Sequence, residues 1–566
     1  MTQTPDAEWL EDKRVLQACK ETASPRKIFA SCFYGQRVYD RADGKSDINV
    51  LLVVSAYSPK VSSSNRRLDG VNLSILAIDK QVFETDVARG KLGELFAEIV
   101  ALPYWPWKNS RYLEEMEVKI KKRFVVELLE NIVRQYPEMS AELLIQPEYF
   151  MYEVIRRQAK LFPPSIYDFS TIFGGRVRKQ NIDSIMNGYL EALKELEAEK
   201  HVVQVDGYVR IDKDFIETTK RNSKRLTNIL VSIRKALLPY IQGISKTATA
   251  LLQNQKLLTN RAFKRTAEEV LAELEETERH LLMPTPLGPV PLSDKITIQD
   301  FVRKAVPGGE ALKITVERMG GVLNSVFLIR LQRDHETRKI VVKKYEDWLG
   351  FKWFPLALWT LGTHSFAVLG ATRLEREYAT SQFLRKNGFN VPSILYVSLK
   401  ERLIFKEFVE GEKVSETVKR VISSSNRGVS SSDIGIIKSV GMEVAKVHSA
   451  GIALGDCKPE NVLATKSGQM CLLDLEQATR NGNQPWDIAE FLYYSGHYIL
   501  PIHPDEAART IASSFIEGYL EAGGKRENVR KAASAKYTKV FSIFTLPNII
   551  VVMANVCKNM GGRGSE

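Results

Sequence analysis

The residues between His448 and Asp474 carry the clearest chemical pattern in the chain. Asp456 and Asn461 lie five positions apart, with Lys458 between them. Asp474 follows at the end of a short apolar stretch. Two carboxylates and an amide at these spacings can bind Mg-ATP beside a hydroxyl group, so the pattern predicts phosphoryl transfer. The alternative is a polar loop between two short strands, in which Asp456 and Asn461 satisfy turn amides.

These motifs resemble those of the protein-kinase-like superfamily, and they are most similar to its small atypical kinases of the KEOPS-complex and RIO types. The resemblance implies that Asp456 is the catalytic base and that Lys458 contacts the γ-phosphate and the substrate. It also implies that Asn461 and Asp474 bind Mg²⁺ or Mn²⁺ together with ATP. Asp487 comes only thirteen positions after Asp474, so no long activation loop fits, and regulation by its phosphorylation is not expected.

The residues upstream supply candidates for binding the nucleotide. Gly320 and Gly321 form a possible glycine-rich loop whose backbone amides approach phosphates, although a plain hairpin turn would also explain them. Lys343 ends an apolar strand predicted at 339–345, as the ATP-binding lysine does in this superfamily. Lys344 is the alternative, because strand alternation points only one of the two lysines inward.

Three further residues complete the kinase-like pattern. Glu377 lies in an amphipathic helix predicted at 373–389 and would pair with the ATP-binding lysine, unless it is an ordinary solvated glutamate. Glu407 and Phe408 fall where the hinge that binds adenine is expected. Asp487 begins a further helix and would brace the catalytic loop, or would simply cap that helix.

His448 is expected to have a structural role. In the family that the chain resembles, the histidine at this position, in an HxxG motif, is held by backbone hydrogen bonds. His448 is therefore not a candidate base.

Residues 1–115 are expected to form an α/β domain that resembles a minimal nucleotidyltransferase. Asp47 precedes a second apolar strand, but Gln36 and Asn49 stand where that family has a serine and a second aspartate. Asp79 comes only at the end of a later strand. One certain carboxylate cannot clamp two metal ions. The domain is therefore predicted to be degenerate, binding nucleotide or RNA without transferring nucleotidyl groups, and a purely structural α/β unit is the alternative.

Residues 116–283 are expected to be mostly helical. A helix at 182–200, a hairpin at 202–211 and a following basic helix are consistent with a winged-helix module. The stretch 220–265 contains eleven Lys or Arg and no Asp or Glu, which nearly equals the net charge of +12 for the whole chain. Such a basic face can bind tRNA or other RNA in a salt-dependent way, or it can dock on an acidic surface of the same protein.

The predicted fold class is multidomain α/β and α+β. A proline-rich linker at 284–295 separates the helical middle region from a C-terminal, bilobal, protein-kinase-like domain at 296–566. The insert 345–373 holds three of the seven tryptophans. It is expected to pack against the helical region, or otherwise to present a surface for a partner.

Composition sets the broad class. A chain of 566 residues with 44% apolar content is typical of soluble multidomain proteins, and no apolar run is long enough to span a bilayer. The polar, acidic N-terminus predicts no secretory signal. Five scattered cysteines without a paired motif predict reduced thiols in a cytoplasmic protein, with no disulfide framework and no zinc site.

Three functions fit these patterns. The first is a Ser/Thr kinase that uses Mg-ATP to phosphorylate itself or a protein partner. The second is an RNA-linked ATPase of the KEOPS-kinase type, which the basic stretch favours. The third is a small-molecule kinase, which Lys458 disfavours because related enzymes of that kind usually lack this lysine. The sequence does not identify the phosphate acceptor.

Overall fold

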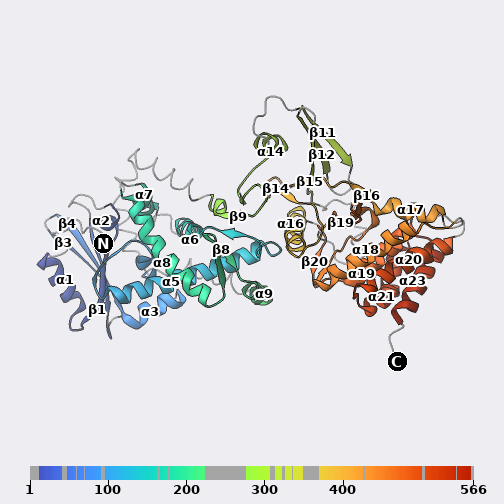
Figure 1. Cartoon of the computed structure of the whole chain (residues 1–566). Helices are drawn as coiled ribbons and strands as arrows, with labels where there is room; N and C mark the ends of the chain where they lie inside the picture. The colour runs from blue at the N-terminus through green and yellow to red at the C-terminus, as the bar shows by residue number, and fades with distance from the viewer. Residues whose placement is uncertain are drawn as a thin grey trace. The chain divides into compact units, whose positions relative to one another are not determined.

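The computed structural model describes most of the chain, and the chain divides into two compact units, Met1–Leu282 and Met283–Glu566 (Figure 1). The described residues are 12–40, 47–58, 60–68, 70–90, 96–161, 166–174, 177–222, 274, 276–305, 313–320, 325–333, 336–347, 367, 369–424, 428–499, 504–542 and 545–562. The regions predicted at 1–115 and 116–283 together correspond to the first unit.

A mixed five-stranded sheet organises the beginning of the first unit. Its strands are β1 (Ile28–Tyr34), β2 (Ile48–Val54), β3 (Val61–Leu68), β4 (Val71–Asp79) and β5 (Trp105–Lys108). The order is β3-β4-β2-β1-β5, with β2 and β4 parallel and the other neighbours antiparallel. All of β2 except Asn49 is buried, as its apolar run predicts. The helices here are α1 (Lys13–Ala23), α2 (Gln36–Asp40), α3 (Lys80–Arg89) and α4 (Ala97–Ala101).

Helices and a small sheet make up the rest of the first unit. The helices are α5 (Ser110–Gln135), α6 (Glu148–Leu161), α7 (Ile166–Gly174), α8 (Arg178–Ala198), α9 (Lys213–Asn222) and the 3-10 helix η3 (Thr277–His280). The strands are β6 (Leu144–Ile145), β7 (Val202–Val205), β8 (Tyr208–Ile211) and β9 (Leu281–Met283). The turn between β7 and β8 has positive φ at both Asp206 and Gly207, as a two-residue Asp-Gly hairpin requires.

The described residues include only the beginning of the predicted basic stretch 220–265. Helix α9 ends at Asn222, and the rest of the stretch 220–265 lies outside the described residues. The structure therefore shows a helix and a hairpin where the sequence predicted them, but it does not extend to the basic segment that follows.

The second unit begins with an antiparallel five-stranded sheet. Its strands are β11 (Lys313–Gly320), β12 (Ser325–Arg333), β13 (Glu336–Lys344), β14 (Ile394–Ser398) and β15 (Leu403–Glu407), in the order β11-β12-β13-β15-β14. Helix α14 (Ile298–Ala305) places Phe301 against Ile329, Val342 and Phe405 in one apolar core. Helix α16 (Gly370–Lys386) follows β13 in the chain and carries Glu377.

The segment predicted as a linker packs within this unit. Val290 in the short strand β10 (Val290–Pro291) belongs to the same apolar core as Phe301, and Leu292 is buried. The hydroxyl of Tyr378 on α16 donates to the carbonyl of Pro284. Of the insert predicted at 345–373, residues 348–366 and 368 lie outside the described residues.

A mostly helical part completes the second unit. Its helices are α17 (Val414–Ser424), α18 (Ser431–Ser449), the 3-10 helix η4 (Pro459–Asn461), α19 (Gln484–Gly496), α20 (Pro504–Glu521), α21 (Arg526–Ala532), α22 (Ala535–Phe541) and α23 (Pro547–Gly562). Its strands are β16 (Gly411–Lys413), β17 (Ile452–Ala453), β18 (Val462–Thr465), β19 (Met470–Leu472) and β20 (Thr479–Arg480). Helices α18 and α20 run side by side in Figure 1. Gly441 and Gly518 permit this close approach, because a Cβ on either would collide with the backbone of the other helix.

None of the described helices combines the length and the apolar character needed to cross a bilayer.

Candidate active site

Lys343 is the inward-facing lysine at the end of β13. It is buried, whereas its neighbour Lys344 is exposed, as alternation along a strand requires. Its Nζ lies 3.0 Å from Glu377 Oε2, 2.7 Å from Asp474 Oδ1 and 2.8 Å from Glu476 Oε2. Of the two lysines that the sequence left open, Lys343 is therefore the one that meets the predicted glutamate and the predicted metal-binding aspartate.

Glu377 is completely buried and accepts hydrogen bonds from three side chains. Lys343 and the hydroxyl of Tyr345 bond to its Oε2, and Lys406 bonds to its Oε1. Lys406 lies on β15, and its Nζ also donates to the carbonyl of Leu473 at 2.9 Å. The sequence analysis missed Lys406, although a lysine inside the apolar run LIFKE was a signal that its charge needs a buried partner.

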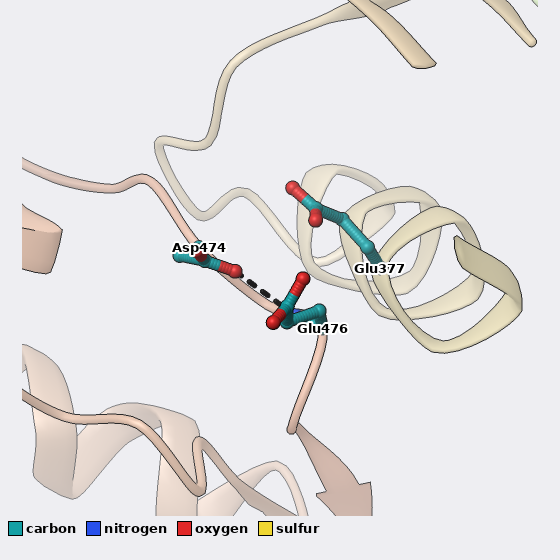
Figure 2. Close-up of side chains that lie close together, drawn as sticks. All are labelled: Glu377, Asp474 and Glu476. Carbon is teal, nitrogen blue, oxygen red and sulfur yellow. Dashed lines mark hydrogen bonds between the residues drawn. The ribbon is translucent and has the colours of Figure 1, made fainter. Parts of the chain in front are cut away.

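Glu476 is the second residue that the sequence analysis missed. Figure 2 shows it beside Asp474, with Glu377 reaching from α16 toward the pair. Oxygen atoms of these three carboxylates lie within 4.8 Å of one another, an arrangement that could hold a metal ion. In this structure all three converge on the ammonium group of Lys343. Glu476 also accepts from Arg373 on α16, with its Oε1 3.1 Å from Arg373 Nη1.

Lys343 and Asp474 stabilise each other's charged forms. Burial lowers the pKa of Lys343, but the carboxylates around it raise that pKa well above its usual range. Burial raises the pKa of Asp474, but Lys343 and Lys406 lower it more, so the pKa falls below its ordinary value. Lys343 and Asp474 are therefore both charged at neutral pH.

The loop between β17 and β18 carries the predicted catalytic residues. Asn461 donates its Nδ2 to the backbone oxygen of Asp456 at 2.9 Å and to Asp456 Oδ2 at 3.0 Å. Lys458 Nζ lies 2.6 Å from the other carboxylate oxygen of Asp456. The N–H of Leu473, directly before Asp474, donates to the carbonyl of Asn461 at 2.9 Å. That bond brings the loop of Asp456 and Asn461 alongside the residues that follow β19, which include Asp474.

Lys458 remains a cation in this setting. Burial lowers its pKa, but the carboxylate of Asp456 and the nearby Glu490 raise it above the ordinary value. The ammonium can therefore attract a phosphate while it orients Asp456.

Asp487 anchors the catalytic loop from behind. It is fully buried in α19, where Oδ2 accepts from the N–H of Leu454 at 2.6 Å and Oδ1 accepts from the N–H of Gly455 at 2.7 Å. Gly455 has a φ of 72°, and a Cβ there would collide with the carbonyl of Gln477. A glycine is therefore required at this point of the loop.

His448 is held differently from the prediction. Its ring bonds to side chains, Nε2 to Asp487 at 2.9 Å and Nδ1 to the hydroxyl of Tyr519 at 2.9 Å, rather than to backbone groups. It is buried and positions Asp487.

Glu490, one helical turn beyond Asp487, supports the same loop. It accepts from the N–H of Cys457 at 2.8 Å and from the indole of Trp486 at 3.1 Å. Burial raises its pKa well above the ordinary value, and the carboxylate of Asp456 adds to this.

The remaining predicted nucleotide-binding residues lie at the ends of strands. Glu407 is the last residue of β15, and its N–H donates to the carbonyl of Ser393 at 2.9 Å. Phe408 follows it, with Lys339 Nζ 4.9 Å from the centre of its ring. Gly320 ends β11, while Gly321 lies outside the described residues. Glu407 and Phe408 thus occupy the connection between the sheet and β16, where a hinge was expected.

The first unit does not bring its predicted carboxylates together. Strands β2 and β4 are parallel, with Ile48 opposite Leu73 and Val54 opposite Asp79. Asp47, which bonds to Asn72 at 3.1 Å, is therefore about seven residues from Asp79 along the sheet, or roughly 20 Å. Two carboxylates at that separation cannot share a metal ion.

Asp79 has local partners instead. It caps α3 by accepting from the N–H of Gln81 at 3.2 Å, and it accepts from the N–H of Tyr57 at 2.8 Å. Lys60 Nζ lies 3.3 Å from it. Burial raises the pKa of Asp79, but the Tyr57 amide and Lys60 lower it below the ordinary value.

Comparison with known proteins places similarity in the second unit. Residues 335–491 match the family described as lipopolysaccharide kinase (Kdo/WaaP). The chain is 28% identical over 105 residues to the KEOPS complex subunit Bud32 of Pyrococcus abyssi, a match that covers 18% of this chain and 44% of that protein. These similarities indicate an atypical kinase domain.

Two further relatives agree with that conclusion. The EKC/KEOPS complex subunit BUD32 of Yarrowia lipolytica is 26% identical over 181 residues, which cover 29% of this chain and 72% of that protein. The probable serine/threonine-protein kinase BUD32 homolog of Archaeoglobus fulgidus is 27% identical over 143 residues, which cover 25% of this chain and 64% of that protein. The chain therefore spans less than half of the Pyrococcus abyssi protein and about two thirds of the other two. None of these matches supports the nucleotidyltransferase-like reading of the first unit.

Proposed function

We propose that the second unit is an atypical kinase that transfers the γ-phosphate of ATP to a serine or threonine hydroxyl of the protein itself or of a protein partner. The observation that carries this proposal is the contact of Lys343 with Asp474 at 2.7 Å, beside the loop that holds Asp456. Phosphoryl transfer needs a cation for the phosphates, a metal-binding carboxylate and a group that orients the hydroxyl. These groups come from separate elements, and the hydrogen bond from Leu473 to Asn461 links the parts of the chain that carry Asp474 and Asp456.

Asp456 is proposed as the residue that orients the acceptor hydroxyl and accepts its proton. Asn461 and Lys458 each contact a different oxygen of its carboxylate, which fixes its direction. Lys458 would turn to the γ-phosphate as the new bond forms. Most of the rate enhancement in such reactions comes from positioning and from electrostatic stabilisation, so this rigid arrangement matters more than the basicity of Asp456.

Lys343 would bind the nucleotide phosphates, and Glu377 would position it. Gly320 and Gly321 would cover the phosphates with backbone amides, and the connection at Glu407 and Phe408 would receive the adenine ring.

Asn461 and Asp474 would hold the metal ion, Mg²⁺ or Mn²⁺. Both offer oxygen donors, which these hard cations prefer. Because Nδ2 of Asn461 donates to Asp456, its amide oxygen points away from that residue. Asp474 is ionised, since nearby lysines lower its pKa. When bound, the ion would neutralise charge on the β- and γ-phosphate oxygens.

The proposed phosphate acceptor is a hydroxyl group of a protein. Lys458 supports a protein hydroxyl, and the relatives named as KEOPS complex subunits support a partner within a protein complex. A carbohydrate hydroxyl is the second candidate, because the family that matches residues 335–491 is described as lipopolysaccharide kinase. The predicted basic stretch 220–265 adds RNA as a stimulator or partner.

The test is incubation of the purified full chain with Mg-ATP labelled at the γ-phosphate, alone, with total RNA, or with lipopolysaccharide. Label on protein serine or threonine is the expected result. Label on the carbohydrate would support the second candidate, and release of free phosphate that rises with RNA without labelled protein would support an RNA-linked ATPase. Absence of transfer and of phosphate release under all conditions would overturn the proposal.

Two variants make this test specific. Asp456→Ala is expected to abolish transfer while ATP affinity, measured by calorimetry, stays within about threefold. Asp505→Ala, at an exposed position on α20, is the matched control and should behave as the wild type. Retained labelling by Asp456→Ala would show that another group orients the hydroxyl.

A further inference from the structure

Helix α16 is held by buried charges at two positions on one face. Arg373 and Glu377 are four residues apart, so both point the same way, and both are completely buried. Arg373 donates to Glu476 at 3.1 Å, and Glu377 accepts from Lys406 and the hydroxyl of Tyr345 in addition to Lys343. The helix is thus attached to β13, to β15 and to the segment that follows Asp474.

The entry to α16 is held by the next residue of that segment. The side-chain amide of Gln477 accepts from the N–H of Ala367 at 2.8 Å and donates to the carbonyl of the same residue at 3.3 Å. Gly370, the first residue of the helix, packs so closely that a Cβ would lie 2.7 Å from the carbonyl oxygen of Tyr345. Ala367, just before the helix, and Gly370, its first residue, are therefore both held by close contacts.

These contacts bear on what Lys343 can do. To bind phosphates it must leave Asp474, which in turn must face a metal ion. Any lengthening of the Lys343–Glu377 contact during that movement would weaken one of the bonds of a buried carboxylate, which is unfavourable unless other donors remain. Lys406 and Tyr345 are those donors. The position of α16 therefore does not depend on the Lys343–Glu377 contact alone.

We propose that Lys406 and the Arg373–Glu476 pair are positioning residues that hold α16 in its active place before nucleotide binds and release Lys343 for the phosphates. This inference rests on the proposed kinase function. It also explains how α16 is ordered although Asp487 follows Asp474 after only thirteen positions, too few for an activation loop. In this proposal, buried ion pairs keep α16 in place, a role that a phosphorylated activation loop would otherwise have.

Hydrogen exchange measured by mass spectrometry tests the proposal, because it reports the order of α16 directly. In the wild type, the amides of residues 374–384 should exchange slowly without nucleotide, and Mg-ATP should change their rates by less than about twofold. Lys343→Met should keep this protection. Lys406→Met and Glu476→Gln should speed exchange in α16 by about tenfold or more, and Mg-ATP should partly restore its protection.

Controls separate positioning from a general loss of stability. Exchange in α20 should stay unchanged in the same variants, whereas general destabilisation would speed both helices. Arg385→Gln, an exposed position on α16, is the matched control, and Lys406→Arg should rescue Lys406→Met. Should Lys406→Met fail to fold, Gln477→Ala removes only the contact with Ala367 and is expected to loosen the start of α16.

Kinetics provide a second readout. Glu476→Gln should lower kcat by about tenfold, with kcat calculated from the concentration of protein that binds nucleotide. The KM for ATP should change by less than about threefold. The proposal is overturned if the wild-type α16 exchanges rapidly until Mg-ATP is added, or if Lys406→Met and Glu476→Gln leave its exchange unchanged. Exchange without nucleotide needs no transfer, so failure of the proposed function would appear separately, as absent ATP binding.

Discussion

Asp79 in the first unit and Asp474 in the second unit follow the same local pattern and have opposite surroundings. Asp79 is the last residue of β4, and Asp474 lies two residues after the end of the buried strand β19. The carboxylate oxygens of Asp79 accept hydrogen bonds from the backbone amides of Tyr57 and Gln81, and Lys60 lies beside it. Asp474 bonds to Lys343, which is 131 positions away in the chain. A strand-end aspartate becomes a cap or a site residue according to partners that its own neighbourhood does not reveal.

The electrostatics sharpen this contrast. Burial raises the pKa of both carboxyl groups, and nearby donors lower both values below normal. For Asp79 the leading donor is a fixed backbone amide, while for Asp474 the leading donors are the lysines Lys343 and Lys406. A backbone amide cannot move away, but a lysine side chain can swing to a phosphate. The surroundings of Asp474 therefore fit the proposed exchange of a cation for a metal ion better than those of Asp79, whose oxygens also accept from backbone amides.

The largest expected effect separates the two aspartates by activity. Asp474→Asn should lower phosphoryl transfer by about a thousandfold, because a neutral amide holds a metal ion poorly. Asp79→Asn should leave the rate within about twofold, since its carboxylate has a structural role. Initial rates of γ-phosphate transfer measure both. Equal losses in the two variants would show that the first unit takes part in the chemistry.

A smaller effect separates two adjacent lysines. Lys343→Met should lower kcat/KM for ATP by about a hundredfold, because the inward ammonium faces the site. Lys344→Met removes the same charge from the exposed side of β13 and should change kcat/KM by less than about twofold. Steady-state kinetics over a range of ATP concentrations give both values. A comparable loss with Lys344→Met would mean that the strand register in solution differs from the one described.

The smallest effect concerns stability. Asp79→Ala removes a helix cap and should lower the free energy of unfolding by about 1–2 kcal/mol, seen as a lower Tm in calorimetry. Because the pKa of Asp79 is lowered on folding, its contribution is present above the unfolded value, about 3.9, and fades as pH falls through the folded value. The Tm difference between wild type and variant should therefore be constant from about pH 5 to 7 and shrink below about pH 4. A difference that grows toward low pH would contradict the assigned cause.

The sequence predicted much of the site because its key residues lie in short motifs. Asp456, Lys458 and Asn461 sit within six consecutive positions, so their neighbourhood is set by one loop. Alternation reduced the candidate for a nucleotide-binding lysine to Lys343 or Lys344, and only the fold shows that Lys343 is the one that points inward, because the inward face of β13 depends on what packs against it.

The residues that the sequence missed have distant partners. Lys406 meets Glu377 across 29 positions, and Glu476 meets Arg373 across 103. No repeating pattern in the local sequence connects residues that lie so far apart in the chain. The same reason explains His448, whose partner Tyr519 lies 71 positions away and replaced the backbone contacts that were expected.

The fold was predictable where patterns were long and regular. The strand predicted at 339–345 overlaps β13, and the predicted helix at 373–389 overlaps α16 with its start displaced to Gly370. That start is set by close packing against Tyr345, which leaves no trace in helical periodicity. In the first unit, the pairing of β2 with β4 put Asp47 and Asp79 at opposite ends, a consequence of register that strand patterns alone do not fix.

The buried thiol of Cys457 gives the catalytic loop a chemical property of its own. Its pKa lies well above the ordinary value, chiefly because of burial, and it sits between Asp456 and Lys458. The other four cysteines are also buried. Since thiolate, not thiol, reacts with electrophiles, the native protein should resist alkylating reagents and mild oxidants. A cysteine introduced on the surface would then be the single reactive thiol, and any alkylation of Cys457 would report that the loop had opened.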